Sequence, residues 1–164
     1  MPFPAFVPNV ASLVIAAGLL TGPSLTGPAR VVDGDTMRVD GIAVRLFGID
    51  APELAQLCGG ASCGVAARAA LRRLTYAKTV TCVEETRDRY KRIVARCVVE
   101  GLDLAAAMTR AGHALAYRQY GSAYVVEERQ AQLAQAGMWA GEFEAPWDWR
   151  RAKRQGKLGP REPG

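Results

Sequence analysis

The sequence predicts an α+β domain in which three helices pack on a small, mainly β barrel. Five short strand-like runs alternate with three segments of helical periodicity along the chain. The 164 residues leave room for one domain of ordinary size. Hydrophobic residues make up 49% and charged residues 23%, near the globular average, which excludes a wholly disordered or fibrous chain.

The N-terminal segment differs in composition from the rest. Residues 1–29 contain no charged side chain, and Val10–Leu20 is almost wholly apolar. This run suits the core of a signal peptide better than a membrane span, which needs about 20 apolar residues. We therefore expect residues 1–28 to be a signal peptide or an N-terminal anchor, the alternative being a buried helix of the domain.

Three strand-like runs come next, each short and bounded by turn residues: Ala29–Val32, Thr36–Val39 and Ile42–Phe47. Asp40-Gly41 joins the last two runs and is a two-residue hairpin signal, because this type of tight turn needs positive φ. The sequence therefore predicts a hairpin whose register pairs Thr36 with Arg45.

Helical and strand signals then alternate. Small and apolar residues recur at positions 67, 70, 71 and 74, which predicts a helix over residues 62–75. Thr79–Val83 and Ile93–Val99 are predicted to form a second hairpin across the charged stretch 84–92. Apolar spacing and glycine stop signals predict two further helices, at residues 104–111 and 122–135.

The net charge of +5 is concentrated at the C-terminal end. Arg150–Gly164 holds six basic residues and one acidic residue, so the preceding residues carry no net charge. The basicity therefore does not by itself indicate a nucleic-acid partner. Because this stretch also lacks an apolar period, we expect a domain over residues 29–149 and a disordered basic tail over residues 150–164.

The four cysteines are an even number in a chain with an export-like start, which predicts disulfides in one of three connectivities. A four-thiolate zinc site is the alternative, but it needs a close pair at each end, and Cys82 is far from Cys97 in the chain. Cys82 and Cys97 face each other in the register of the second hairpin, so we expect them to bond. The two remaining cysteines, Cys58 and Cys63, are then expected to form the second disulfide.

Carboxylates cluster at the ends of the first hairpin. Asp35 lies just before the first strand of the hairpin, and Asp50 and Glu53 follow the second strand on a loop fixed by Pro52. Three carboxylates that meet would repel one another without a cation, and the absence of His and Cys from this cluster favours calcium or magnesium over zinc. The alternative is that these acidic residues are ordinary turn residues with no site. The hairpin register places Arg45 beside them, which favours a site.

Three motifs in order carry a resemblance to a known family: Asp33-Gly34-Asp35-Thr36, Arg45–Glu53 and Asp88–Arg92. Over about residues 29–140 the chain resembles the staphylococcal-nuclease-like (thermonuclease) family. The resemblance implies an OB-fold, which is a five-stranded barrel with three packed helices. It also implies calcium-dependent hydrolysis of DNA and RNA phosphodiesters that leaves 3′-phosphates.

The resemblance also implies roles for single residues. Asp35 and Asp50 match the family's calcium carboxylates, and Ala51 matches the position that supplies a backbone carbonyl. The catalytic trio of the family matches Arg45, Glu53 and Arg92. Lys91 departs from the pattern, since the family usually has glycine before the last of these arginines; if that backbone needs positive φ, lysine is strained there.

The chemistry of phosphodiester hydrolysis fits this residue set. Negative charge gathers on the phosphoryl oxygens, and the planar forks of Arg45 and Arg92 can each hold two of them. Glu53 can position and deprotonate the attacking water. Arg89, Tyr90 and Tyr117 are candidate substrate contacts, the alternatives being a solvated loop charge and aromatic packing.

The sequence thus predicts an exported endonuclease with Ca²⁺ as cofactor and DNA or RNA as substrate. We expect a monomer outside the cytoplasm, secreted or periplasmic, whose only membrane contact is through the N-terminal segment. The alternative function is a non-catalytic OB-fold module that binds nucleic acid through the same surface.

Overall fold

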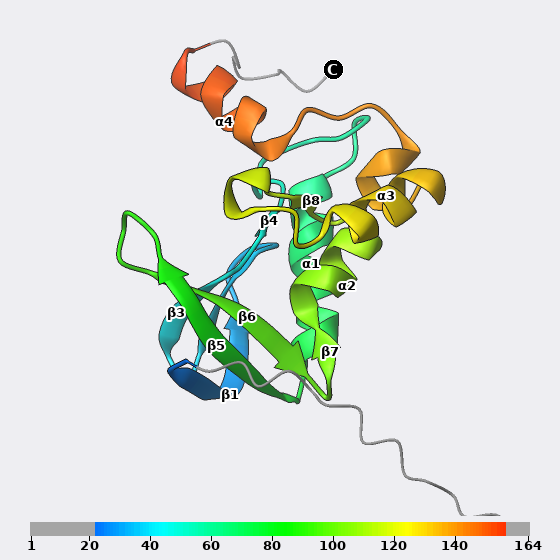
Figure 1. The fold of residues 1–164 in the computed structure, drawn as a ribbon. Coiled ribbons are helices and arrows are strands. Elements are labelled where there is room, and N and C mark those ends of the chain that lie inside the picture. The colour runs from blue at the N-terminus through cyan, green and yellow to red at the C-terminus, as the bar shows by residue number, and fades with distance from the viewer. Residues whose placement is uncertain (1–21, 157–164) are drawn as a thin grey trace, which may run out of the picture.

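The structure, a computed structural model, describes residues 22–156. Its centre is a five-stranded barrel in the order β3-β2-β1-β5-β6, closed by parallel pairing between β3 and β6. The barrel strands are β1 (Ser24–Val31), β2 (Thr36–Val39), β3 (Ile42–Leu46), β5 (Thr79–Arg87) and β6 (Ile93–Val99). The other neighbours pair antiparallel. This arrangement confirms the predicted α+β barrel (Figure 1).

Three short strands complete the sheets. β4 (Ile49–Asp50) pairs with β8 (Leu115–Ala116), and β7 (Leu102–Asp103) continues the sheet beyond β6. The β4–β8 pair lies where the barrel meets the helices, so it links the loop after the first hairpin to the helical half of the molecule (Figure 1).

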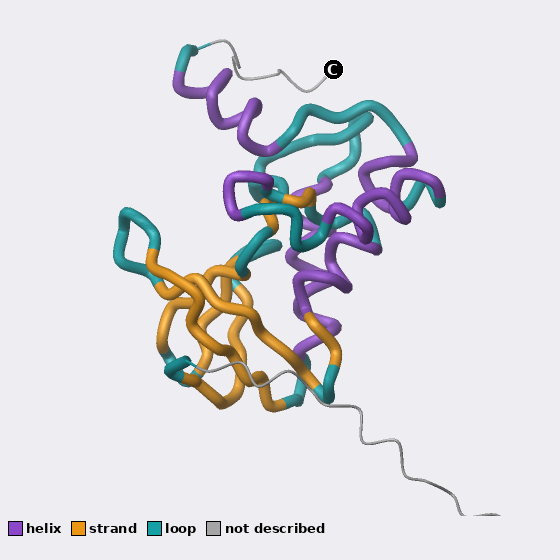
Figure 2. The backbone as a smooth tube through the Cα atoms, in the orientation of Figure 1, coloured by secondary structure: helices purple, strands orange, loops and turns teal. Residues whose placement is uncertain are grey.

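Within residues 22–156 there are four α-helices: α1 (Cys63–Thr75), α2 (Leu104–Arg110), α3 (Val125–Leu133) and α4 (Pro146–Arg154). Two short 3₁₀ helices, η1 (Arg118–Tyr120) and η2 (Gly137–Ala140), flank α3. The helices α1, α2 and α3 lie where periodicity predicts them, and α2 packs between the other two. In Figure 2 these three helices gather on one side of the barrel, whereas α4 stands apart.

The core fills the barrel and the space between the barrel and the first two helices. Among its fully buried side chains are Met37, Val44, Leu46, Leu71, Leu104 and Met108. Burial of each such side chain contributes about 1.5–3 kcal/mol. A second, smaller cluster of Cys63, Leu115 and Met138 packs against partly buried Trp147 and thereby holds the segment that leads into α4.

Both predicted disulfide bonds are present, Cys58–Cys63 and Cys82–Cys97, and the pairing confirms the disulfide interpretation over the zinc alternative. Cys82 and Cys97 are direct partners in the β5–β6 ladder, with Cα atoms 4.0 Å apart. This bond fixes the hairpin whose far end carries the loop at residues 88–92. Disulfides are typical of oxidising compartments.

The two ends of the domain differ from the expected boundaries. β1 begins at Ser24, before the expected boundary at residue 29. The expectation that residues from 150 onward form a disordered tail is wrong for residues 150–154, which belong to α4. Pro146 at the first turn and basic residues in the last turn stabilise this helix without an apolar stripe.

Residues 1–21, which hold most of the expected signal peptide or anchor, and residues 157–164 lie outside the described part of the chain. Within the described part, no helix has both the length and the apolar character that crossing a bilayer requires.

Candidate active site

The loop before β2, the end of β3 and the segment from β4 onward meet at one end of the barrel. Asp35 precedes β2, Arg45 lies near the end of β3, and Asp50 ends β4. The predicted register holds, because the Leu46 N–H donates to the Asp35 carbonyl over 2.8 Å. The hairpin thus places Asp35 beside Arg45.

Two glycines let these segments approach closely. A Cβ atom on Gly34 would lie 2.7 Å from the Cβ atoms of Ala51 and Ala67. A Cβ atom on Gly64, in the first turn of α1, would collide with the carbonyl group of Glu53. The lack of a side chain at Gly34 and Gly64 therefore lets the Asp35 turn, the Glu53 loop and α1 pack closely together.

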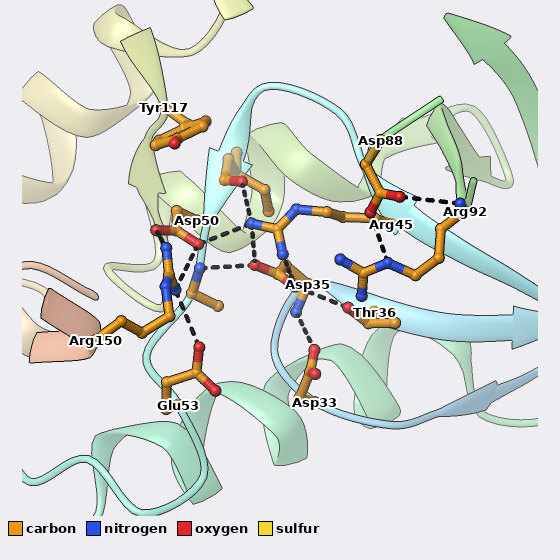
Figure 3. A network of polar contacts seen from close by, with 12 residues as sticks. Asp33, Asp35, Thr36, Arg45, Asp50, Glu53, Asp88, Arg92, Tyr117 and Arg150 are labelled. Atoms are coloured by element: carbon orange, nitrogen blue, oxygen red, sulfur yellow. Dashed lines mark hydrogen bonds and ion pairs between the residues drawn. The ribbon is translucent and has the colours of Figure 1, made fainter. Parts of the chain in front are cut away.

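Arg45 joins the two buried carboxylates. Its Nη2 lies 3.0 Å from Asp35 Oδ2 and 2.8 Å from Asp50 Oδ1, and its Nη1 donates to Asp35 Oδ1 over 3.2 Å. Figure 3 shows the guanidinium group between the two acids. Burial acts to lower the pKa of Arg45, but the charges of Asp35 and Asp50 outweigh it and raise the pKa, so Arg45 stays charged.

Both carboxylate oxygens of Asp35 accept hydrogen bonds from the protein. Oδ1 accepts from the Thr36 hydroxyl over 2.9 Å, and Oδ2 accepts from the Ala51 N–H over 3.0 Å. Burial raises the pKa of Asp35, and the charge of Arg45 offsets this only in part. A further cation at this carboxylate would stabilise its ionised form.

The loop between β5 and β6 presents Arg92 to the same site. Asp88 Oδ2 accepts from Arg92 Nε over 2.7 Å, and Asp88 Oδ1 accepts from the backbone N–H groups of Tyr90 and Arg92. Lys91 adopts φ of 62°, the left-handed region for which the usual glycine is suited. The loop therefore keeps its turn with lysine in place of glycine.

All of the ion-paired side chains above except fully buried Asp50 line one cleft of about 710 Å³. Its charged lining residues are Asp33, Asp35, Arg45, Glu53, Arg87, Asp88, Arg89, Arg92, Arg150 and Arg154, and its aromatic ones are Tyr90, Tyr117 and Tyr120. The structure thus brings all three predicted substrate contacts, Arg89, Tyr90 and Tyr117, to the wall of the cleft that holds the predicted catalytic residues. Tyr90 is 66% exposed, and the Arg89 guanidinium carbon lies 4.8 Å from the centre of its ring.

Arg150 on α4 also belongs to this site, although the sequence analysis places it in a tail. Its Nη2 donates to Asp50 Oδ2 over 2.7 Å, and its Nη1 donates to Asp50 Oδ1 over 3.2 Å and to Glu53 Oε1 over 3.0 Å. Burial acts to lower the pKa of Arg150, but the hydrogen bond and charge of Asp50 outweigh it and raise the pKa. Trp147 and Trp149 beside it are the sequence signal for an ordered segment.

Gln56 is a second residue that the sequence analysis missed. Its side chain is fully buried, accepts from the Glu53 N–H over 3.3 Å and donates to the Glu144 carbonyl over 2.7 Å. It therefore ties the loop of Glu53 to the segment before α4. A single glutamine in a loop gives no sequence signal for such a role.

The oxygen donors of the cluster fit a hard cation. Asp35 and Asp50 touch the same atom, Arg45 Nη2, so a positive group already bridges the two carboxylates. Within residues 22–156, no three His, Cys, Asp or Glu side chains are grouped to hold a metal ion on their own. Asp35 and Asp50 therefore offer fewer oxygen ligands than calcium or magnesium takes, and such ions also bind water and phosphate.

Comparison with known proteins settles the family. The family model described as staphylococcal nuclease homologue matches residues 43–141, more than half of the chain. The chain belongs to the staphylococcal nuclease family. This result confirms the resemblance and the fold that it implies, and family membership makes the protein a nuclease, an enzyme that hydrolyses phosphodiester bonds of nucleic acid.

Several family members are similar over most of the domain. An uncharacterized endonuclease of Escherichia coli is 36% identical over 132 residues, which cover 76% of this chain and 83% of that protein. A micrococcal nuclease of Shigella flexneri is 36% identical over 143 residues, with 76% and 79% covered. A probable staphylococcal-like nuclease of Oryza sativa subsp. japonica is 35% identical over 117 residues, which cover 70% of this chain and 30% of the rice protein.

Proposed function

We propose that the protein is a calcium-dependent endonuclease of DNA, RNA or both. The observation that carries the proposal is the pair of buried carboxylates, Asp35 and Asp50, that share one nitrogen of Arg45 beside a cleft lined by further arginines. An acidic pair beside cationic groups suits a metal ion and a phosphodiester at once.

Asp35, Asp50 and the carbonyl of Ala51 would hold the calcium ion. Calcium takes about 6–8 oxygen ligands, so water and a phosphate oxygen would complete the set. When bound, the ion polarises a phosphoryl oxygen and offsets the negative charge that develops in the transition state.

Glu53 would act on the attacking water. Its side chain is 42% exposed, so water can reach the carboxylate from the cleft. One of its oxygens accepts from Arg150, which leaves the other to orient the water and accept its proton. The tie between the Glu53 N–H and buried Gln56 keeps the loop in place.

Arg45 and Arg92 would clamp the phosphate. Arg92 uses Nε for Asp88, which leaves its two terminal nitrogens for a phosphate in the cleft. Arg45 keeps its charge beside the two acids and lies on a barrel strand, so its position is rigid. Two fixed cations stabilise the charge that gathers on the phosphoryl oxygens.

Arg89, Tyr90 and Tyr117 would contact the substrate away from the reacting phosphate. Exposed Tyr90 offers a face on which a base can stack, and Arg89 beside it can pair with a neighbouring phosphate. Tyr117 lies 5.6 Å from Tyr120, ring centre to ring centre, and both line the cleft. This surface suits a single strand, whose bases are free to stack.

We also propose that the enzyme works as a monomer outside the cytoplasm, secreted or periplasmic, with the N-terminal segment as export signal or anchor. The two disulfides support this location, since such bonds persist where thiols are not kept reduced. The proposed catalytic residues all belong to one chain, so the proposed site needs no second copy.

The test incubates the purified protein with labelled single-stranded DNA and RNA, in calcium and in excess chelator. We expect internal cleavage with calcium and none with chelator. Unchanged cleavage in chelator would refute the metal assignment. Binding without cleavage at every calcium concentration would support the non-catalytic OB-fold alternative instead.

A further inference from the structure

Arg150 brings a second arginine to the carboxylate cluster, from helix α4, which contributes no catalytic residue to the function proposed above. Its guanidinium group spans both oxygens of Asp50 and one oxygen of Glu53. Figure 3 shows it on the side of Asp50 opposite to Arg45. Asp50 is fully buried, so these two arginines, and not water, stabilise its negative charge.

The helix that carries Arg150 touches the site at few other points, among them the Trp147 ring, whose centre lies 5.9 Å from that of Tyr117. Of α4, only Pro146 is fully buried, and Trp147 is partly buried against the small cluster around Met138. Of the other basic residues of the helix, Arg151 pairs with Asp148 on α4 itself, and Arg154 lines the cleft but forms no ion pair with Asp50. The ion pairs of Arg150 are therefore a specific link between α4 and the carboxylates.

The charge of the cluster indicates what this link does. Asp35, Asp50 and Glu53 carry three negative charges, against which Arg45 and Arg150 place two positive ones. A cation that is bonded to Asp50 repels any second cation at the same carboxylate. It also occupies lone pairs on both oxygens, which a metal ion would use.

We propose that Arg150 is an internal counter-cation of the metal site, which stabilises Asp50 and Glu53 in the metal-free protein and thereby sets a low calcium affinity. The inference rests on the proposed calcium site, but it concerns a residue outside the family's motifs. In this role Arg150 is a positioning residue, since it acts through Asp50 and Glu53.

The test measures calcium binding by titration calorimetry on the whole protein and three variants. Arg150→Gln removes the charge, and we expect about tenfold tighter calcium binding, about 1.4 kcal/mol. Arg150→Lys keeps the charge and should bind calcium within about twofold of wild type. Arg151→Gln is the matched control: it removes the same charge from the next residue, which is 62% exposed, and should change the affinity by less than about twofold.

Thermal unfolding of the same variants gives a second measurement that does not depend on activity. Calcium should raise the Tm of Arg150→Gln more than that of wild type, because the tighter-binding protein gains more from the ligand. Arg45 still bonds Asp50 in this variant, so the domain should fold.

Equal or weaker calcium binding by Arg150→Gln would overturn the inference and leave the proposed nuclease function standing. Equal tightening by Arg151→Gln would also overturn it, because net charge alone would then explain the effect. Absence of calcium binding in both wild type and Arg150→Gln would overturn the inference together with the calcium site.

Discussion

Arg150 and Asp50 lie 100 residues apart in the sequence, yet two hydrogen bonds of 2.7 and 3.2 Å join their side chains. The same carboxylate accepts from Arg45 over 2.8 Å. One buried acid therefore links Arg45 on the barrel to Arg150 on the C-terminal helix.

The first prediction concerns the proposed base. Glu53→Gln keeps the size of the side chain but removes the charge that would accept a proton from water. We expect kcat to fall by at least about 100-fold, with little change in substrate affinity or Tm. Single-turnover cleavage and equilibrium binding of labelled DNA measure the two quantities. A variant that keeps most of its turnover would exclude Glu53 from this role.

The second prediction separates the two arginines of the β5–β6 loop. Arg92→Ala should lower kcat by about 100-fold or more, because its clamp matters most as charge develops in the transition state. Arg89→Ala is the control from the same loop and should mainly raise KM and reduce the salt dependence of binding. The opposite result, loss of turnover in Arg89→Ala alone, would reverse the two roles.

The third prediction concerns the backbone before Arg92. Lys91 has φ of 62°, which strains a residue with a Cβ atom, so Lys91→Gly should stabilise the fold by about 0.5–1 kcal/mol. For a domain of this size we expect a rise of about 2–4 °C in Tm, with activity retained. Arg89→Gly, whose backbone is not left-handed, should lower Tm instead. A drop in Tm for Lys91→Gly would show that the lysine side chain makes a stabilising contact.

The fourth prediction is a pH dependence of stability. Burial acts to raise the pKa of Asp88, but the hydrogen bonds from Arg92 and Tyr90 outweigh it and hold the pKa below its ordinary value of 3.8. The stabilisation is therefore complete above this value and is lost as the pH falls through the lowered pKa.

Thermal unfolding of wild type and Asp88→Asn across the pH range checks this sign. Wild type should exceed the variant in Tm by a constant amount above about pH 5, and the difference should vanish in strong acid. A difference that grows as the pH falls would mean that Asp88 titrates in the opposite sense.

The sequence was sufficient for the parts of the site that depend on local pattern. The Asp40-Gly41 turn sets the hairpin register, which in turn places Asp35 beside Arg45. The register of the second hairpin likewise brings Cys82 opposite Cys97. In both cases a short turn and side-chain alternation determine which residues meet.

The contacts of Arg150 with the site could not be predicted from local sequence patterns. Five of the nine residues of its helix are charged and only Pro146 is fully buried, so the helix has no clear apolar period. Its ion pairs are with residues that are distant in the sequence. Gln56 is similar, because its partners, Glu53 and Glu144, are set by how the two segments dock. Local patterns predict elements and turns, but they do not predict contacts that form only when those elements meet.

The most direct test of the central claim is the calcium dependence of cleavage by wild type and Asp50→Asn. If Asp50 is a calcium ligand in the active site, removal of its charge should weaken calcium binding more than DNA binding. We expect cleavage by wild type to saturate with calcium, and the variant to need at least about tenfold more calcium for its residual rate. An unchanged calcium midpoint in Asp50→Asn, or full cleavage in chelator, would contradict the account.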